Sequence, residues 1–138
     1  ILLNYCDFYF DDLLSVTLPQ VKDVMNRRQQ VEAIMESLNL KMMDGNSTFY
    51  FFVSIEEYDG SSKDFALSLL IEKCVSVVPG SAYGKSTDRY VRVSFGSESV
   101  ERIIEGLERI RTHIDTHRFN EKELDNSFEM LKLPKPKF

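Results

Sequence analysis

Arg92 is the residue of this sequence whose type and position most directly suggest binding chemistry. It lies at the centre of residues 90–95, where apolar and polar residues alternate with the period of two that is typical of a β-strand. A guanidinium is planar and permanently charged, and it can donate two parallel hydrogen bonds to a carboxylate. Because a desolvated charge needs a partner, a mid-strand arginine indicates either a sheet face open to water or a binding site for an anion.

The residues around Arg92 predict a unit of strand, turn, loop and strand over positions 74–95. A short apolar strand at 75–78 is stopped by the turn residues Pro79 and Gly80. A polar loop follows at 81–88, and the alternating strand then begins at Tyr90. One face of that strand carries Val91, Val93 and Phe95, and the opposite face carries Tyr90, Arg92 and Ser94.

His113 and His117 are a second pair with a spacing that can bind a metal, because residues four apart share one face of a helix. The neighbouring sequence shows no third ligand. We therefore expect exposed histidines near a helix C-terminus and assign no metal site. Three aspartates at positions 7, 11 and 12 have the spacing of a solvated helix face and are interpreted in the same way.

The elements that must position Arg92 are predicted from periodicity and capping residues. A helix is expected to start at Thr17-Leu18-Pro19, with an apolar stripe from Val21 to Leu38 and a solvated basic face at Arg27 and Arg28. A short strand at 40–43 and a turn at 44–46 lead to a strand at 48–55. That strand is apolar on both faces, so it is expected to be covered on both sides.

Two further helices are expected on the same grounds. Ser61-Ser62 begins one helix, which ends at Lys73, and Ser97 caps another with a regular apolar stripe from Val100 to Ile114. A last helix is expected after Asn120, ending before two prolines at 134 and 136. The order predicts an α/β fold of the two-layer sandwich kind, with a small mixed or antiparallel sheet and helices packed on one face.

Composition limits the class of protein. The chain has 138 residues, 43% of them hydrophobic and 28% charged, which is ordinary for a globular domain. Its formal net charge of -5 argues against nucleic-acid and anionic-membrane partners. No apolar run reaches the length of a membrane span. The two cysteines, Cys6 and Cys74, form no disulfide framework and fit a reducing, cytoplasmic location.

The motifs VSVVPGS, YG and YVRVSF, followed by a helix that contains EGLERI, resemble the C-terminal small domain of class I/II aminotransferases of fold type I. The resemblance covers about residues 18–111 and agrees with the predicted element order. It divides the chain into an N-terminal segment of uncertain structure at 1–16, an aminotransferase-like small domain at 17–116 and a helical tail at 117–138.

The resemblance implies a pyridoxal-phosphate enzyme that transfers an amino group between an amino acid and a 2-oxo acid. Arg92 matches the family's arginine that binds the substrate α-carboxylate. The cofactor lysine belongs to the family's large domain, and neither Lys73 nor Lys85 matches it, so no catalytic or cofactor-binding residue is assigned here. The chain alone is expected to be inactive without that large domain, and the complete enzyme to be a homodimer.

Two observations leave alternatives open. The family usually has glycine, close to the substrate, where this chain has Ser47, which puts the usual pocket in question and fits a relative that has lost activity. The chain alternatively fits a non-catalytic regulatory or interaction module, since fold does not determine function. The open reading frame would separate these interpretations, because the enzyme requires an upstream domain with a cofactor lysine.

Overall fold

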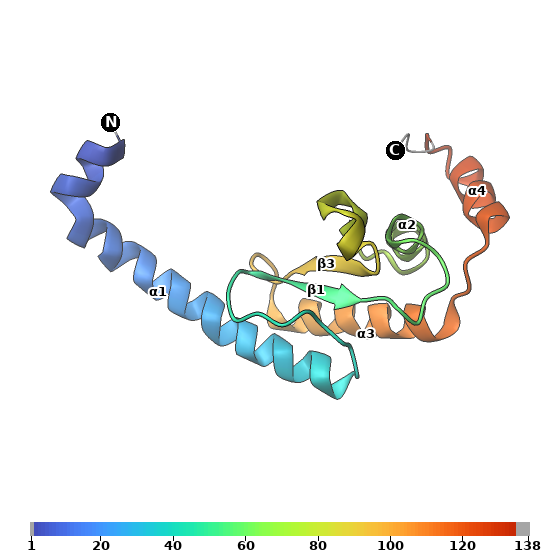
Figure 1. Cartoon of the computed structure of the whole chain (residues 1–138), viewed down its shortest axis with the longest axis horizontal. Coiled ribbons are helices and arrows are strands. Elements are labelled where there is room, and N and C mark those ends of the chain that lie inside the picture. The colour runs from blue at the N-terminus through green and yellow to red at the C-terminus, as the bar shows by residue number, and fades with distance from the viewer. Residues whose placement is uncertain (1, 135–138) are drawn as a thin grey trace.

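The N-terminal helix α1 (Leu2–Ser37) is longer than predicted. The structure is a computed structural model that describes the backbone of residues 2–134 and the side chains of residues 8–134. The predictions for the side chains of Tyr5, Cys6 and Asp7, and for Pro136, lie outside the described residues. The predicted start at Thr17–Pro19 is wrong, because α1 continues through Pro19. The proline removes one helical hydrogen bond, and its exposed position lets water satisfy the freed carbonyl. Figure 1 shows the N-terminal part of α1 projecting away from the sheet.

Three short strands form one antiparallel sheet in the order β1-β3-β2. They are β1 (Tyr50–Ser54), β2 (Val78–Pro79) and β3 (Tyr90–Ser94). Each is shorter than the sequence predicts, and the expected strand at 40–43 is reduced to a single bridge between Met42 and Val53. β3 is central, and Arg92 lies opposite Phe52 of β1 and Val78 of β2.

The inner face of the sheet lies in the hydrophobic core. Val53 and Val91 are fully buried there, and Phe51 almost so. The core is completed by residues of α1, of α2 (Ser62–Lys73) and of α3 (Val100–Thr116), which are Val31, Met35, Phe65, Leu69, Ile103, Leu107, Ile110 and Ile114. The predicted split of β3 into a buried face with Val91 and a second face with Arg92 is confirmed, although Val93 is only partly buried.

Capping residues define where the helices begin and end. Ser61 caps α2 at the predicted start of this helix, and the structure adds a reciprocal capping box with Asp64. α3 begins later than expected, because Ser99 and not Ser97 accepts the hydrogen bond from the Arg102 amide. Asn120 caps the last helix, α4 (Glu121–Met130), in agreement with the prediction.

The β2–β3 connection consists of two short 3-10 turns, η1 (Gly80–Tyr83) and η2 (Lys85–Thr87). Together the elements form a mixed fold of helices around a small antiparallel sheet, which confirms the predicted α/β class (Figure 1). Within residues 2–134, no helix is both long and apolar enough to cross a membrane.

Candidate functional site

Arg92 projects from the middle of the central strand, on the face opposite the core. Strand pairing places the side chains of Tyr50, Phe52 and Tyr90 on this same outer face. These three side chains and Arg92 itself are all half-buried. Arg92 therefore lies neither in the hydrophobic core nor in open water. Because β3 is hydrogen-bonded on both sides, the arginine is carried by a rigid element.

The Arg92 guanidinium lies among aromatic rings and has no acceptor. Its central carbon is 5.3 Å from the centroid of the Tyr50 ring and 5.6 Å from that of Tyr83. Its Nε atom is buried without a hydrogen-bond partner, and the described part of the chain offers the guanidinium no ion pair. An aromatic ring attracts a cation through its face but leaves the N–H donors of the cation free for hydrogen bonds. The donors therefore stay available for an external anion.

The Pro79-Gly80 turn brings Tyr83 to this face. Gly80 is buried, and a Cβ atom there would overlap the Thr87 carbonyl and lie 2.5 Å from the Tyr90 carbonyl oxygen. The Thr87 hydroxyl donates a 2.7 Å hydrogen bond to the Gly80 carbonyl, which closes the turn. The Tyr83 ring then packs edge-on against Phe52, at 5.2 Å between centroids. The glycine is required here for close backbone approach and not for a positive φ.

Arg28, predicted to lie on a solvated face, is instead 3% exposed. It donates to the carbonyls of Gly45 at 2.6 Å and Ser47 at 2.9 Å and lies over the Phe51 ring at 4.1 Å. Arg27 likewise donates to the carbonyls of Phe95, Gly96 and Glu98. The prediction of a solvated basic face is therefore wrong, because both guanidinium groups donate to loop carbonyls.

Ser47, where the resembling family has glycine, lies in the loop that Arg28 holds. Ser47 is exposed, and the positive φ of this loop falls on Thr48, at 74°. The backbone at position 47 thus accepts a side chain without strain. The structure does not place Ser47 in contact with Arg92.

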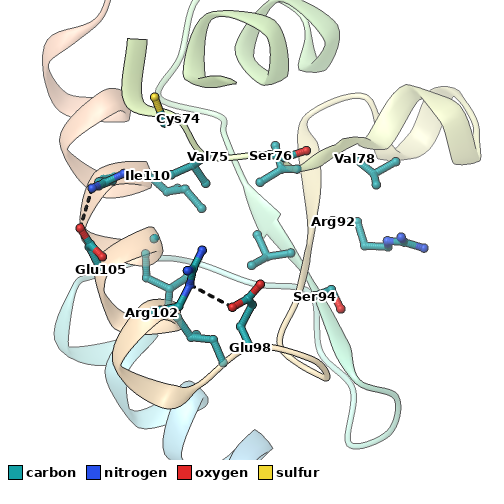
Figure 2. A pocket seen from close by; sticks show the side chains of 16 residues that line it. Cys74, Val75, Ser76, Val78, Arg92, Ser94, Glu98, Arg102, Glu105 and Ile110 are labelled. Carbon is teal, nitrogen blue, oxygen red and sulfur yellow. Dashed lines mark hydrogen bonds and ion pairs between the residues drawn. The ribbon is translucent and has the colours of Figure 1, made fainter. Parts of the chain in front are cut away.

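A cavity of about 380 Å³ is lined by residues 74–78, by Arg92, Val93 and Ser94 of β3, and by α3. Figure 2 shows the Arg92 guanidinium pointing away from Arg102 and Ile110 on the wall of this cavity. The other charged groups of the wall are paired with each other, Arg102 with Glu98 and Arg109 with Glu105. The cavity therefore does not supply the missing partner of Arg92.

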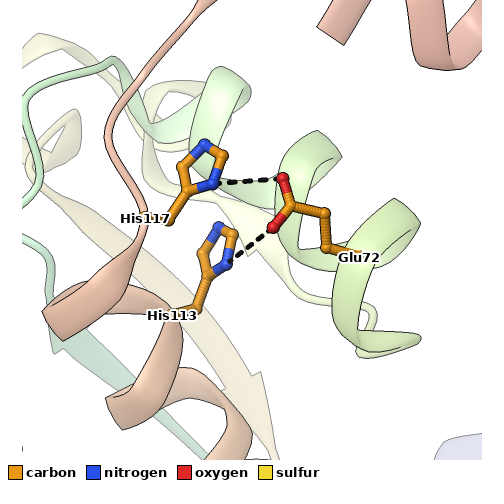
Figure 3. Close-up of side chains that lie close together, drawn as sticks. All are labelled: Glu72, His113 and His117. Carbon is orange, nitrogen blue, oxygen red and sulfur yellow. Dashed lines mark ion pairs between the residues drawn. The ribbon is translucent and has the colours of Figure 1, made fainter. Parts of the chain in front are cut away.

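The two histidines are not exposed as predicted. His113 is fully buried and His117 partly so, and their stacked rings are 4.4 Å apart between centroids. Glu72 of α2 faces both rings, with a carboxylate oxygen 3.1 Å from His117 Nδ1 and the other 3.8 Å from His113 Nδ1 (Figure 3). Burial lowers the pKa of His113 to about 4, and the nearby charges of His117 and Lys73 act in the same direction. Sequence reasoning missed Glu72 because it lies 41 positions from His113.

This fold and the sequence motifs define the class of protein. The family described as "Aminotransferase class I and II" matches residues 18–110, and the chain belongs to this family. Its members generally depend on pyridoxal phosphate.

Comparisons with individual proteins agree with this family assignment. The chain is 33% identical to an aspartate aminotransferase of Pyrococcus abyssi, in an alignment that covers 64% of this chain and 23% of that protein. It is also 33% identical to a probable N-acetyl-LL-diaminopimelate aminotransferase of Bacillus subtilis, in an alignment that covers 76% of this chain and 25% of that protein. An aromatic aminotransferase from Pyrococcus horikoshii matches in structure with a TM-score of 0.60 and 32% identity, over 75% of this chain and 26% of that one. The chain thus spans about a quarter of the length of these relatives.

A Schiff base with pyridoxal phosphate needs a lysine amine held in a closed site. Lys85 is exposed on η2, and Lys73 ends α2, where its carbonyl accepts a hydrogen bond from Arg109. Arg92 is therefore the residue on which the proposal below is built.

Proposed function

We propose that this chain is the C-terminal, substrate-binding lobe of a pyridoxal-phosphate-dependent aminotransferase, and that Arg92 binds the α-carboxylate of the amino acid or 2-oxo acid. One observation carries the proposal. Among the residues that the structure describes, Arg92 is the arginine whose guanidinium has no carbonyl or carboxylate acceptor. Each of the other arginines donates to at least one such group.

The surroundings of Arg92 suit a carboxylate. The guanidinium carbon lies over the rings of Tyr50 and Tyr83, at 5.3 and 5.6 Å from their centroids, and these rings accept no in-plane hydrogen bond, so the N–H groups can form a fork of two parallel hydrogen bonds with a carboxylate. A domain that closes over the substrate excludes water, so this pair would contribute more than an exposed ion pair does. By analogy with hydrogen bonds to charged groups, we expect about 2–4 kcal/mol of binding free energy.

The same proposal covers the organisation of the whole protein. Residues 17–116 would form the small domain, a two-layer sandwich with helices on one face. Residues 1–16 would extend α1 beyond this domain, and residues 117–138 would form a tail. The large domain of the same protein would hold the cofactor and supply the catalytic lysine, and the chain alone would be inactive. We propose a cytoplasmic homodimer as the complete enzyme.

The test compares substrates with and without a carboxylate in the complete enzyme. Arg92→Ala should lower kcat/KM for an amino acid by roughly 30- to 1000-fold, from about 1.4 kcal/mol per factor of ten. The corresponding decarboxylated amine should lose far less. Arg92→Lys should recover only part of the loss, because an ammonium group offers no planar fork.

Arg102→Ala is the matched control, because Arg102 is an exposed arginine on α3 that is paired with Glu98. It should leave both substrates nearly unaffected. Equal losses for the amino acid and the amine in Arg92→Ala would mean that Arg92 stabilises the fold, and the carboxylate role would be abandoned.

A further inference from the structure

Glu72, His113 and His117 place three metal-ligating atoms within 4.8 Å of one another. They come from two helices, since Glu72 lies near the end of α2, His113 in the last turn of α3, and His117 at the C-cap of α3. Figure 3 shows both Nδ1 atoms turned toward the Glu72 carboxylate. This cluster lies outside the Arg92 site, and its chemistry is independent of the proposed function.

The buried histidine has one ring nitrogen, Nδ1, that is without a hydrogen-bond partner in the described structure and faces Glu72. Its other ring nitrogen, Nε2, lies 2.9 Å from Ser68 Oγ, which itself lies 3.1 Å from the Phe65 carbonyl. In the tautomer in which Ser68 donates to that carbonyl and accepts from Nε2–H, Nδ1 carries a free electron pair.

In that tautomer Nδ1 and the Glu72 carboxylate are both acceptors, and a cation between them would satisfy both. Divalent metals bind this combination, and a ligating histidine usually donates its second ring N–H to an oxygen, a position that Ser68 Oγ occupies beside Nε2. Bond lengths of about 2.0–2.2 Å in a tetrahedral site separate donors by about 3.3–3.6 Å. The observed separations of 3.1 and 3.8 Å bracket that range.

The cluster combines two packed ligands with one adjustable one. His113 is held by ring contacts with Tyr58 and Phe65, and the His117 ring stacks on Tyr58 and on His113, whereas the Glu72 side chain is 41% exposed. Rotation of the Glu72 side chain can therefore complete the coordination, and a metal can enter from solvent on that side. Two imidazoles and a carboxylate are a ligand set used by Zn²⁺, with a fourth position left for water.

We propose that Glu72, His113 and His117 form a binding site for a zinc ion that links the C-terminal end of α2 to the end of α3. The ion would fix the point at which the chain leaves α3 for α4, because His117 is the C-cap of α3. Its role is structural, since the ligands come from packed helices and the site is separate from Arg92.

The experiment measures Zn²⁺ binding to the 138-residue chain without a histidine tag, by competition with a chelating dye after EDTA treatment. We expect a single ion per chain, an increase in Tm on Zn²⁺ addition, and visible absorption bands typical of four-coordinate cobalt when Co²⁺ replaces zinc. Glu72→Gln and His117→Asn should each weaken binding by at least about 10-fold, the lower end of what even an outer partner of a metal ligand costs. Glu72 is exposed, so Glu72→Gln should fold, and the metal-free Tm of both variants checks folding.

Two variants serve as matched controls. Cys74→Ser removes an exposed thiol two residues from Glu72 that could bind zinc by itself, and Glu105→Gln removes a comparable carboxylate on α3. Both should bind Zn²⁺ as the unchanged chain does. The proposal is overturned if no ion binds, if Glu72→Gln and His117→Asn bind as tightly as the unchanged chain, or if Cys74→Ser abolishes binding.

Discussion

Arg28→Met should destabilise this chain more than any surface arginine substitution. Arg28 joins α1 to the loop before β1 through the carbonyls of Gly45 and Ser47, and it also covers the Phe51 ring. Methionine is similar in length and keeps apolar contact with that ring but donates no hydrogen bond. The substitution therefore isolates the contribution of the guanidinium donors.

The expected loss in the free energy of unfolding follows from the strength of the Arg28 hydrogen bonds. A hydrogen bond to a charged group contributes about 1.5–3 kcal/mol, so the two shortest bonds of Arg28 give about 3–6 kcal/mol. Gly45 and Ser47 are exposed, so water can replace part of what their carbonyls lose. The ion pair with Glu32 adds little, because the Glu32 side chain is 31% exposed. We expect a net loss of about 2–4 kcal/mol in the free energy of unfolding.

Urea denaturation followed by far-UV circular dichroism measures this loss. The midpoint should fall while the slope with urea concentration stays constant, since the surface exposed on unfolding changes little. Arg102→Met is the matched control, because the Arg102 side chain is 74% exposed, and it should change the free energy by less than about 0.5 kcal/mol. A loss below about 1 kcal/mol for Arg28→Met, or one equal to that of the control, would refute the role of Arg28 as a clamp.

Two further stability predictions use the same assay. Gly80→Ala should destabilise the chain by about 3 kcal/mol or more, because the added Cβ would overlap the Thr87 carbonyl, whereas Gly106→Ala, with open space in mid-helix, should stabilise it by about 0.5–1 kcal/mol. Equal effects of the two alanines would contradict the steric account. Ser61→Ala should cost about 1 kcal/mol by removing the capping box with Asp64, and an unchanged midpoint would show that the cap contributes nothing.

The elements of this fold that the sequence predicts well are those fixed by local chemistry. The capping box at Ser61 and the Asn120 cap depend on residues a few positions apart, and both are present in the structure. The alternation around Arg92 likewise predicts the two faces of β3. The start of α1 is mispredicted because proline is normally a boundary signal, and a long exposed helix tolerates the loss of one hydrogen bond at Pro19.

The two errors at charged or polar residues have a common cause. Arg28 and His113 are both predicted to be solvated, because their types are usually found at surfaces. Each is buried beside a hydrogen-bond partner distant in sequence: the carbonyls of Gly45 and Ser47 for Arg28, and Ser68 for Nε2 of His113. No local pattern encodes such pairings, so spacing along one helix could not find them.

The assignment of Arg92 depends on a physical distinction that the sequence does not contain. Arg89, three residues earlier, donates to the carbonyls of Ile55, Glu56, Tyr58 and Gly60, so its charge is used to close the turn after β1. Arg92 has the same chemistry but lies between neighbouring strands, whose carbonyls are directed to one another in the sheet and not outward. An arginine on the outer face of a central strand therefore has to find its acceptor outside the sheet. In the described part of this chain its guanidinium lies near the rings of Tyr50 and Tyr83 and has no carbonyl or carboxylate acceptor, and the proposed carboxylate role rests on this difference from Arg89.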